Sequence, residues 1–223
     1  MENLYNKNGL FFWTEEEIKL RNFFEEFLLS SLMGSLKQQN QAFQALKVEA
    51  PILTPLGYIN KNYSPDDFFS FGDLALRPET TMGSYEYAKH ILSGYNDIKY
   101  RPPIVIYQHG KSFRREQDQA TKFMRLKEFY QLEFQIIYAE NTKNDYAPLV
   151  FEKMRESISK LLGTCKVEAS DRLPDYSDET MDIVFEENDM EVCSMSRRKD
   201  LEGYKVLEVA VGTDRLIYNF NAA

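Results

Sequence analysis

The sequence of 223 residues predicts an α+β fold, and three kinds of local pattern carry that prediction. Residues 14 to 33 and 144 to 162 each repeat apolar side chains at helical spacing, so each indicates a helix with one buried face. Residues 110 to 134 hold two strand-like runs on either side of a polar loop, which is typical of an antiparallel hairpin. Residues 206 to 218 read as a buried strand that turns at Gly212 into a helix. We therefore expect helices that flank a sheet.

The first helix should begin at Thr14, because Thr14 and Glu17 form the sequence of a capping box. Gly34 is expected to break this helix, and the Gln-rich stretch after it leaves a continuation open. Residues 45 to 55 then read as a strand, which Pro51 limits to an edge or an irregular position.

Shorter elements fill the middle of the chain. Residues 68 to 71 read as a short strand, and residues 77 to 93 as a turn followed by a helix. Residues 104 to 107 form an apolar strand that leads into the hairpin, and Gly163 is expected to end the second long helix. Residues 165 to 195 are strand-like with turns.

The predicted core consists of apolar residues on these elements. Its members are Phe23, Phe27, Ile52, Ile106, Phe129, Phe134, Ile136, Val150, Met154, Ile158, Val184, Leu207 and Val209. Phe129 has two interpretations, because it belongs either to this core or to a ligand site.

The composition is that of a globular protein. Apolar residues make up 43% and charged residues 28%, and no apolar run approaches the roughly 18 residues of a membrane span. The N-terminus lacks the basic start and long apolar core of a signal peptide. The cysteines, Cys165 and Cys193, give no disulfide framework, and the histidines, His90 and His109, have no zinc-site spacing. We therefore expect no membrane association and a cytoplasmic location.

The net charge of −8 bears on nucleic-acid partners. A protein that holds RNA by broad electrostatics usually carries a basic face. The acidic total weighs against tight binding of a tRNA by this chain alone, although a local basic patch can coexist with it.

Charged and aromatic side chains gather on one face of the predicted hairpin. Because side chains alternate along a strand, Arg114 and Glu116 point the same way. Arg125, Lys127 and Phe129 share a face on the second strand for the same reason. Guanidiniums bind phosphate oxygens, a ring stacks on a base and a carboxylate accepts from an exocyclic amine, so this set suits a nucleoside triphosphate. The alternative is a solvated hairpin with cross-strand salt bridges.

Several segments, in this order and spacing, resemble class II aminoacyl-tRNA synthetases and are closest to the glycyl-tRNA synthetase branch. Residues 113 to 129, with FRRE at the start and an arginine and a phenylalanine near the end, resemble motif 2. Residues 76 to 83, LRPETTMG, resemble the LRPETAQG segment of the glycyl enzymes, and residues 110 to 116, GKSFRRE, resemble their GxSFRNE. Residues 208 to 215, EVAVGTDR, resemble motif 3, EPSxGxxR.

Other positions follow the glycyl pattern with departures. Residues 189 to 200 resemble the ELEGIANRTD segment, with Glu191 at its first glutamate and Ser194 at its glycine. Asp175 stands where the HYAKxTxDI segment has histidine, and Ala210 stands where motif 3 has serine. These departures bear on the identity of the amino acid more than on an ATP site.

The resemblance spans roughly residues 15 to 220 and implies the class II synthetase core, a mostly antiparallel sheet flanked by helices. It implies one catalytic domain over residues 1 to 223, without an anticodon-binding domain. The long helix and following strand resemble motif 1, the dimer-forming motif of this class, so a homodimer through residues 15 to 55 is expected.

The resemblance also implies an ATP site. Arg114 would bridge the amino-acid carboxylate and the α-phosphate, while Arg125 and Arg215 would hold the γ-phosphate end of a bent ATP. Phe129 and the flat face of Arg215 would enclose the adenine, and Glu116 would accept from its amine. Arg114 and Arg215 are the expected catalytic residues.

The remaining implied residues are acidic or amidic. Glu79, Gln131 and Glu191 would bind the amino acid. Glu208 would ligate Mg²⁺, a hard ion suited to carboxylate and phosphate oxygens.

The implied function is ATP-dependent amino-acid activation, with glycine as the expected amino acid. The acceptor stays open between a tRNA read at its acceptor stem and another nucleophile, such as a carrier protein or a small amine. The alternative is a catalytically silent, synthetase-like accessory subunit. Retention of the three motif arginines and of the motif 2 glutamate favours the enzyme.

Overall fold

A seven-stranded sheet forms the centre of the protein, as a computed structural model of residues 8–59, 61–93, 100–115, 125–171 and 173–222 describes it. The strand order is β1-β5-β6-β10-β9-β8-β7. The bounds are β1 Gln44–Lys47, β5 Ile104–Phe113, β6 Glu128–Ala139, β7 Cys165–Ala169, β8 Ser177–Phe185, β9 Met190–Arg198 and β10 Tyr204–Gly212. β1 pairs parallel with β5, and every other neighbouring pair is antiparallel. The predicted α+β class with a mostly antiparallel sheet is confirmed.

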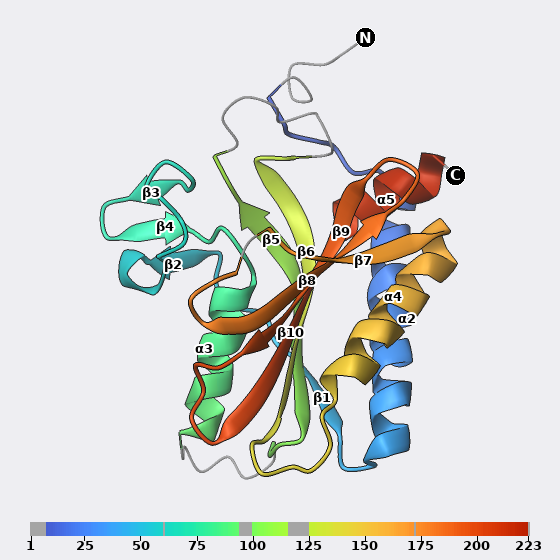
Figure 1. The fold of residues 1–223 in the computed structure, drawn as a ribbon. Helices are drawn as coiled ribbons and strands as arrows, with labels where there is room; N and C mark the ends of the chain where they lie inside the picture. The colour runs from blue at the N-terminus through green and yellow to red at the C-terminus, as the bar shows by residue number, and fades with distance from the viewer. Residues whose placement is uncertain (1–7, 60, 94–99, 116–124, 172, 223) are drawn as a thin grey trace.

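Helices cover both faces of this sheet (Figure 1). α2 (Glu15–Gln39), α4 (Ala147–Leu162) and α5 (Thr213–Ala222) lie on one face, and α3 (Thr81–Leu92) lies on the other. The larger core fills the space between the sheet and α2, α4 and α5. None of the helices in the described ranges is long and apolar enough to cross a membrane.

Strand β6 separates the two faces by the alternation of its side chains. Leu132, Phe134 and Ile136 belong to the core beneath α2 and α4. Glu133 and Gln135 are also fully buried, but they lie on the opposite face with α3. One strand therefore supplies both an apolar core and a polar floor.

The predicted capping box of α2 is confirmed, since the Thr14 amide donates to the Glu17 carboxylate at 2.8 Å. The predicted break at Gly34 is wrong, because α2 continues to Gln39. Buried Leu32 and Leu36 hold the helix to the core on both sides of the glycine, which outweighs its low helix propensity.

The prediction of one strand over residues 45 to 55 is also wrong. β1 ends at Lys47, and β2 belongs to a second, antiparallel sheet of order β2-β4-β3. Its strands are β2 Leu53–Pro55, β3 Ser70–Phe71 and β4 Leu74–Leu76, with a short 3₁₀ turn at Leu56–Tyr58. Between β1 and β2, the buried Arg77 guanidinium donates to the carbonyls of Ala50 at 2.7 Å and Pro51 at 3.2 Å. These bonds use backbone acceptors that a continuous ladder would need.

Two predicted core residues are exposed. Phe23 is 47% and Ile52 is 44% accessible to solvent. Phe23 lies one position from the buried stripe that Phe24, Leu28 and Leu32 form on α2. Ile52 lies in the chain segment that leaves the main sheet.

The close approach of α3 to the segment before β2 leads to a stability prediction. A Cβ atom at Gly83 would lie 2.1 Å from the Cβ of Ala50, so Gly83→Ala should destabilise the fold by about 1 to 3 kcal/mol. Gly34 is the matched control, because no atom lies within 4 Å of a Cβ built there. Gly34→Ala should stabilise by roughly 0.5 to 1 kcal/mol. Urea unfolding should show midpoints that move in opposite directions, and midpoints that move together would contradict this packing.

Candidate active site

A cavity of about 660 Å³ lies over the polar face of the sheet. Eight of the nine predicted site residues line it, namely Glu79, Arg114, Arg125, Phe129, Gln131, Glu191, Glu208 and Arg215. The ninth, Glu116, falls outside the described residues. The cavity therefore brings together residues from four separate parts of the sequence.

Arg114 lies just beyond the end of β5, where its amide still donates to the Lys127 carbonyl at 3.0 Å. Its Nε donates to the Pro78 carbonyl at 3.0 Å, and its guanidinium carbon lies 5.1 Å from the centre of the Phe129 ring. The predicted shared face of the hairpin thus brings Arg114 and Phe129 together, although the first strand ends at Phe113 rather than near residue 116.

Tyr63 joins two predicted site residues. Its hydroxyl donates to Oε2 of Glu79 at 2.7 Å and accepts from Nη2 of Arg114 at 3.1 Å. Burial, together with the nearby charge of Glu208, raises the pKa of Glu79, and the Tyr63 hydrogen bond opposes that shift. Sequence reasoning missed Tyr63 because it lies in a loop without periodicity.

The other predicted amino-acid ligands, Gln131 and Glu191, line the same cavity and have partners of their own. Glu191 accepts through its carbonyl from Nη1 of Arg215 at 2.6 Å, and its carboxylate lies 3.7 Å from the same nitrogen. Gln131 accepts through Oε1 from the Ser112 hydroxyl at 2.5 Å. Glu191 is thus a neighbour of Arg215, a predicted phosphate-binding residue. Gln131 lies beside Thr80, whose amide donates to its Oε1 at 3.4 Å.

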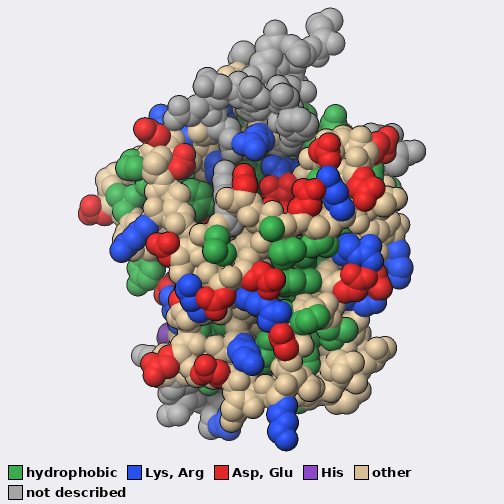
Figure 2. All heavy atoms as spheres, viewed as in Figure 1, with side chains coloured by type: hydrophobic (Ala, Val, Ile, Leu, Met, Phe, Trp, Pro, Cys, Tyr) green, Lys and Arg blue, Asp and Glu red, His purple; other side chains and the backbone are tan. Residues whose placement is uncertain are grey.

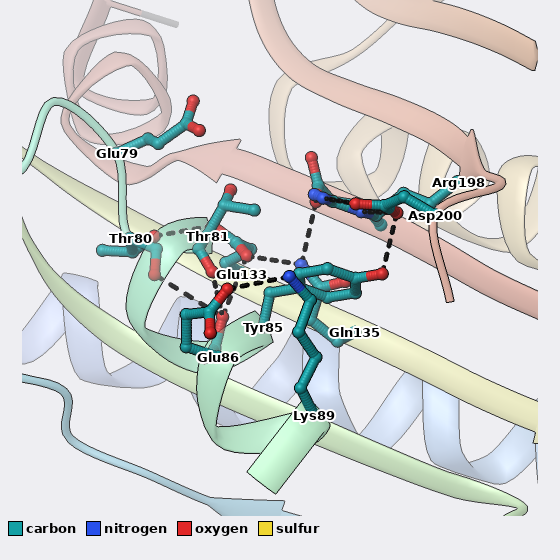
Figure 3. A network of polar contacts seen from close by, with 12 residues as sticks. Glu79, Thr80, Thr81, Tyr85, Glu86, Lys89, Glu133, Gln135, Arg198 and Asp200 are labelled. Atoms are coloured by element: carbon teal, nitrogen blue, oxygen red, sulfur yellow. Dashed lines mark hydrogen bonds and ion pairs between the residues drawn. The ribbon is translucent and has the colours of Figure 1, made fainter. Parts of the chain in front are cut away.

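Beneath this surface, Glu133 is fully buried among donors. Four groups donate to its carboxylate at 2.7 to 3.1 Å, namely the hydroxyls of Thr80, Thr81 and Ser84 and the amide of Gln135. Burial, with the charge of Glu208 added, raises its pKa to about 8. Figure 3 shows this cluster, with Glu79 directed away from it.

Arg198 closes the network at its other end (Figure 3). Its Nη1 donates to Oε2 of Glu208 at 2.6 Å, and its other nitrogens bind Asp200 at 2.8 and 3.0 Å. The rings of Tyr85 and Tyr176 lie on its guanidinium, with centroids 3.7 and 3.9 Å away. This buried cation was missed, because the sequence around it, SRRKD, has the composition of a surface segment.

Glu208 as a magnesium ligand stays a prediction, and one of its two carboxylate oxygens is already hydrogen-bonded. Its Oε2 accepts from both Arg198 and Gln135, so a cation already neutralises the carboxylate. Among the residues that the structure describes, no group of three or more His, Cys, Asp or Glu side chains is placed to hold a metal ion.

Two of the departures from the glycyl pattern are neighbours in space. Ser194 on β9 and Ala210 on β10 are direct cross-strand partners, and both line the cavity. Ala210 thus has no hydroxyl where motif 3 of the glycyl enzymes has a serine, while its partner Ser194 on the adjacent strand carries one. The Ser194 hydroxyl hydrogen-bonds to Asp182, whose pKa is raised chiefly by burial.

Asp214 lies at the start of α5 and lines the cavity, although it is only 2% exposed. Its Oδ2 accepts from the Tyr130 amide at 2.9 Å, and Oδ1 has no hydrogen-bond partner among the described residues. Burial raises its pKa to about 7.

Comparison with solved structures defines the class of fold. A pyrrolysyl-tRNA synthetase of Desulfitobacterium hafniense matches with a TM-score of 0.61 and 18% identity, over 88% of this chain and 66% of that one. The fold is that of the catalytic domain of a class II aminoacyl-tRNA synthetase.

Sequence comparison then points to one branch. The glycine–tRNA ligase of Mycoplasmopsis synoviae is 31% identical over 115 residues, which is 49% of this chain and 25% of that protein. The glycine–tRNA ligase of Ureaplasma parvum is 28% identical over 178 residues, or 64% of this chain and 36% of that protein. No protein-family model matches the chain. The resemblance to the glycyl branch is confirmed.

The match covers about a quarter to a third of these relatives' length. The single domain and the lack of an anticodon-binding domain therefore stay predictions.

The Arg198 network leads to a stability prediction. Arg198→Met should destabilise the fold by about 3 to 5 kcal/mol, because it leaves buried Glu208 without its cation. Arg198→Met with Glu208→Gln should recover part of the loss. Arg155→Met, at an exposed ion pair on α4, is the control and should stay within about 0.5 kcal/mol. Urea unfolding measures all of these, and an Arg198→Met loss no larger than that of the control would contradict the network.

Asp214 leads to a prediction about pH. Its pKa is about 7 in the folded protein against 3.8 ordinarily, so the folded state holds more protons between these values. Its contribution to stability should therefore fall as pH rises from about 4 to 7. Asp214→Asn keeps an oxygen for the Tyr130 amide and should flatten this part of the pH profile of unfolding free energy. An unchanged profile would show that Asp214 is ionised throughout.

Proposed function

We propose that this chain activates a small amino acid, in the first place glycine, by joining it to ATP as an aminoacyl-adenylate. One observation carries the proposal: Glu79 and the three arginines of the class II motifs line the same cavity. These arginines are Arg114, Arg125 and Arg215. A carboxylate suits the ammonium of an amino acid, and guanidiniums suit a triphosphate. Similarity to glycine–tRNA ligases supports the same reaction.

The reaction needs position and charge neutralisation rather than a protein nucleophile. A carboxylate oxygen of the amino acid attacks the α-phosphorus of ATP, the bond to the β-phosphate bridging oxygen breaks, and pyrophosphate leaves. Arg114 neutralises both the attacking carboxylate and the α-phosphate. Tyr63 supports this role, because its two hydrogen bonds keep Arg114 and Glu79 within reach of the two ends of one amino acid.

ATP is held by the remaining residues of the cavity. Arg125 and Arg215 bind the terminal phosphates, while Phe129 and the face of Arg215 enclose the adenine. Mg²⁺ that enters with ATP would neutralise phosphate charge, and Glu208 would help to hold it. Glu116 accepts from the adenine amine in this proposal, and Gln131 and Glu191 complete the amino-acid site.

The proposal includes a homodimer through residues 15 to 55. Exposed apolar side chains in this region support it, since Ile18 is 38%, Phe23 47% and Leu53 48% accessible. The acceptor in the proposal is a tRNA read at its acceptor stem, or another nucleophile such as a carrier protein or a small amine. Acidic and basic side chains are intermixed on the face that Figure 2 shows, which favours a small contact area over a broad RNA-binding surface.

Exchange of labelled pyrophosphate into ATP tests the function. The wild type should exchange with glycine, and Arg114→Ala should lower kcat/KM by at least about a hundredfold, as expected for loss of a charge that acts on the transition state. Arg155→Ala, which removes an exposed arginine on α4, should not change it.

The other amino acids decide between the remaining possibilities. Exchange with a different amino acid would keep the mechanism and point to Ser194 and Ala210 as the altered part of the pocket. No exchange with any of the twenty amino acids, in a folded protein, would favour the silent accessory subunit.

A further inference from the structure

Tyr130 lies where the sheet loses a strand. β10 pairs with β6 as far as Gly212, which is opposite Gln131, and then turns into α5. Side chains of the first turn of α5 therefore make the hydrogen bonds to Tyr130 that a further residue of β10 would have made. The Thr213 hydroxyl donates to the Tyr130 carbonyl at 3.1 Å, and Asp214 accepts from the Tyr130 amide at 2.9 Å. Both backbone groups of Tyr130 thus depend on α5.

Helix α2 reaches Tyr130 by two routes. The Arg21 guanidinium carbon lies 3.6 Å from the centre of the Tyr130 ring. Four residues on, and so on the same side of the helix, Glu25 contacts Nδ1 of His109 at 3.0 Å. Nε2 of His109 lies 3.0 Å from the Thr213 hydroxyl, so this chain of polar contacts ends at the Tyr130 carbonyl.

The chain of contacts depends on where its protons are. Thr213 has one hydroxyl proton, and the Glu25 carboxylate only accepts. When His109 is neutral and donates to Glu25, the Thr213 proton goes to Nε2 and the Tyr130 carbonyl loses its bond. When both ring nitrogens carry protons, Thr213 is free to donate to Tyr130.

The surroundings of His109 set the balance between these states. Burial lowers its pKa, Glu25 raises it, and the cations Arg21 and Lys47 lower it further. The edge of its ring also packs against the Tyr130 ring. The groups that face His109 therefore come from α2 (Arg21 and Glu25), β1 (Lys47), β6 (Tyr130) and α5 (Thr213).

We propose that Glu25 and His109 are positioning residues, which act through Thr213 on Tyr130 and so fix Phe129 and Gln131 in the cavity. Side chains alternate along β6, so the Tyr130 ring lies against Arg21 of α2 while the side chains of Phe129 and Gln131 project from the other face of the strand. All three residues line the cavity. The effect on catalysis rests on the proposed function. The chain of contacts from Glu25 through His109 and Thr213 to Tyr130 does not rest on the proposed function. It connects α2, the helix of the proposed dimer, to the proposed ATP site.

The first test measures the link without activity. The Gln131 amide nitrogen belongs to the same peptide unit as the Tyr130 carbonyl, so its chemical shift reports the Thr213 bond. In the wild type, this shift should follow the titration of the His109 ring. In Thr213→Val, the Gln131 shift should no longer follow the titration of His109. In Glu25→Gln, the pH midpoint of the Gln131 shift should change. His90→Asn, at the exposed second histidine, is the control and should leave it unchanged. A Gln131 shift that ignores His109 in the folded wild type would overturn the proposal.

The second test measures ATP use. Because Phe129 stacks on adenine in the proposed function, His109→Asn and Glu25→Gln should raise the KM for ATP about tenfold with a smaller change in kcat. The double variant Glu25→Gln, Thr213→Val should be no worse than the poorer single variant, since both break one chain. Additive losses, or an unchanged KM, would overturn the positioning role.

The two failures are distinguishable. A wild type without pyrophosphate exchange would reject the proposed function, and the Gln131 shift would still decide whether the link exists.

Discussion

The ion pair between Arg198 and Glu208 is the interaction on which the floor of the cavity depends. Glu208 is 7% exposed and its neighbour in the network, Glu133, is fully buried, so neither carboxylate has bulk water to solvate it. Unpaired buried charges cost several kcal/mol each. Arg198 and the hydroxyls of α3 replace that water, and they tie β6, β9, β10 and α3 into one polar layer.

This layer determines what the cavity can do. Arg198 neutralises Glu208, and Glu79 is linked to Arg114 through the hydroxyl of Tyr63. Arg125 and Arg215, which we propose to bind phosphates, line the same cavity. The cavity therefore presents both acidic and basic groups, as the proposed reaction of an amino acid with ATP requires. Tyr130 then links this surface to α2, on the far side of the sheet.

Local patterns predicted most of the elements, and motif spacing predicted eight of the residues that line the cavity. The capping box at Thr14 and the turn at Gly212 depend on neighbouring residues only, and both are where the sequence placed them. Errors arose where distant residues compete. Arg77 donates to carbonyls that a strand through Pro51 would have used. The sequence around Arg198 indicates a surface residue, but in the fold two tyrosines and two carboxylates surround its guanidinium. No local signal predicts such partners.

The most direct test of the account is a crystal structure of the protein with ATP and Mg²⁺. The account predicts a bent ATP in the cavity, with adenine against Phe129, the α-phosphate at Arg114 and the terminal phosphates at Arg125 and Arg215. An ATP bound in an extended form, bound away from these arginines, or absent at saturating concentration would contradict it.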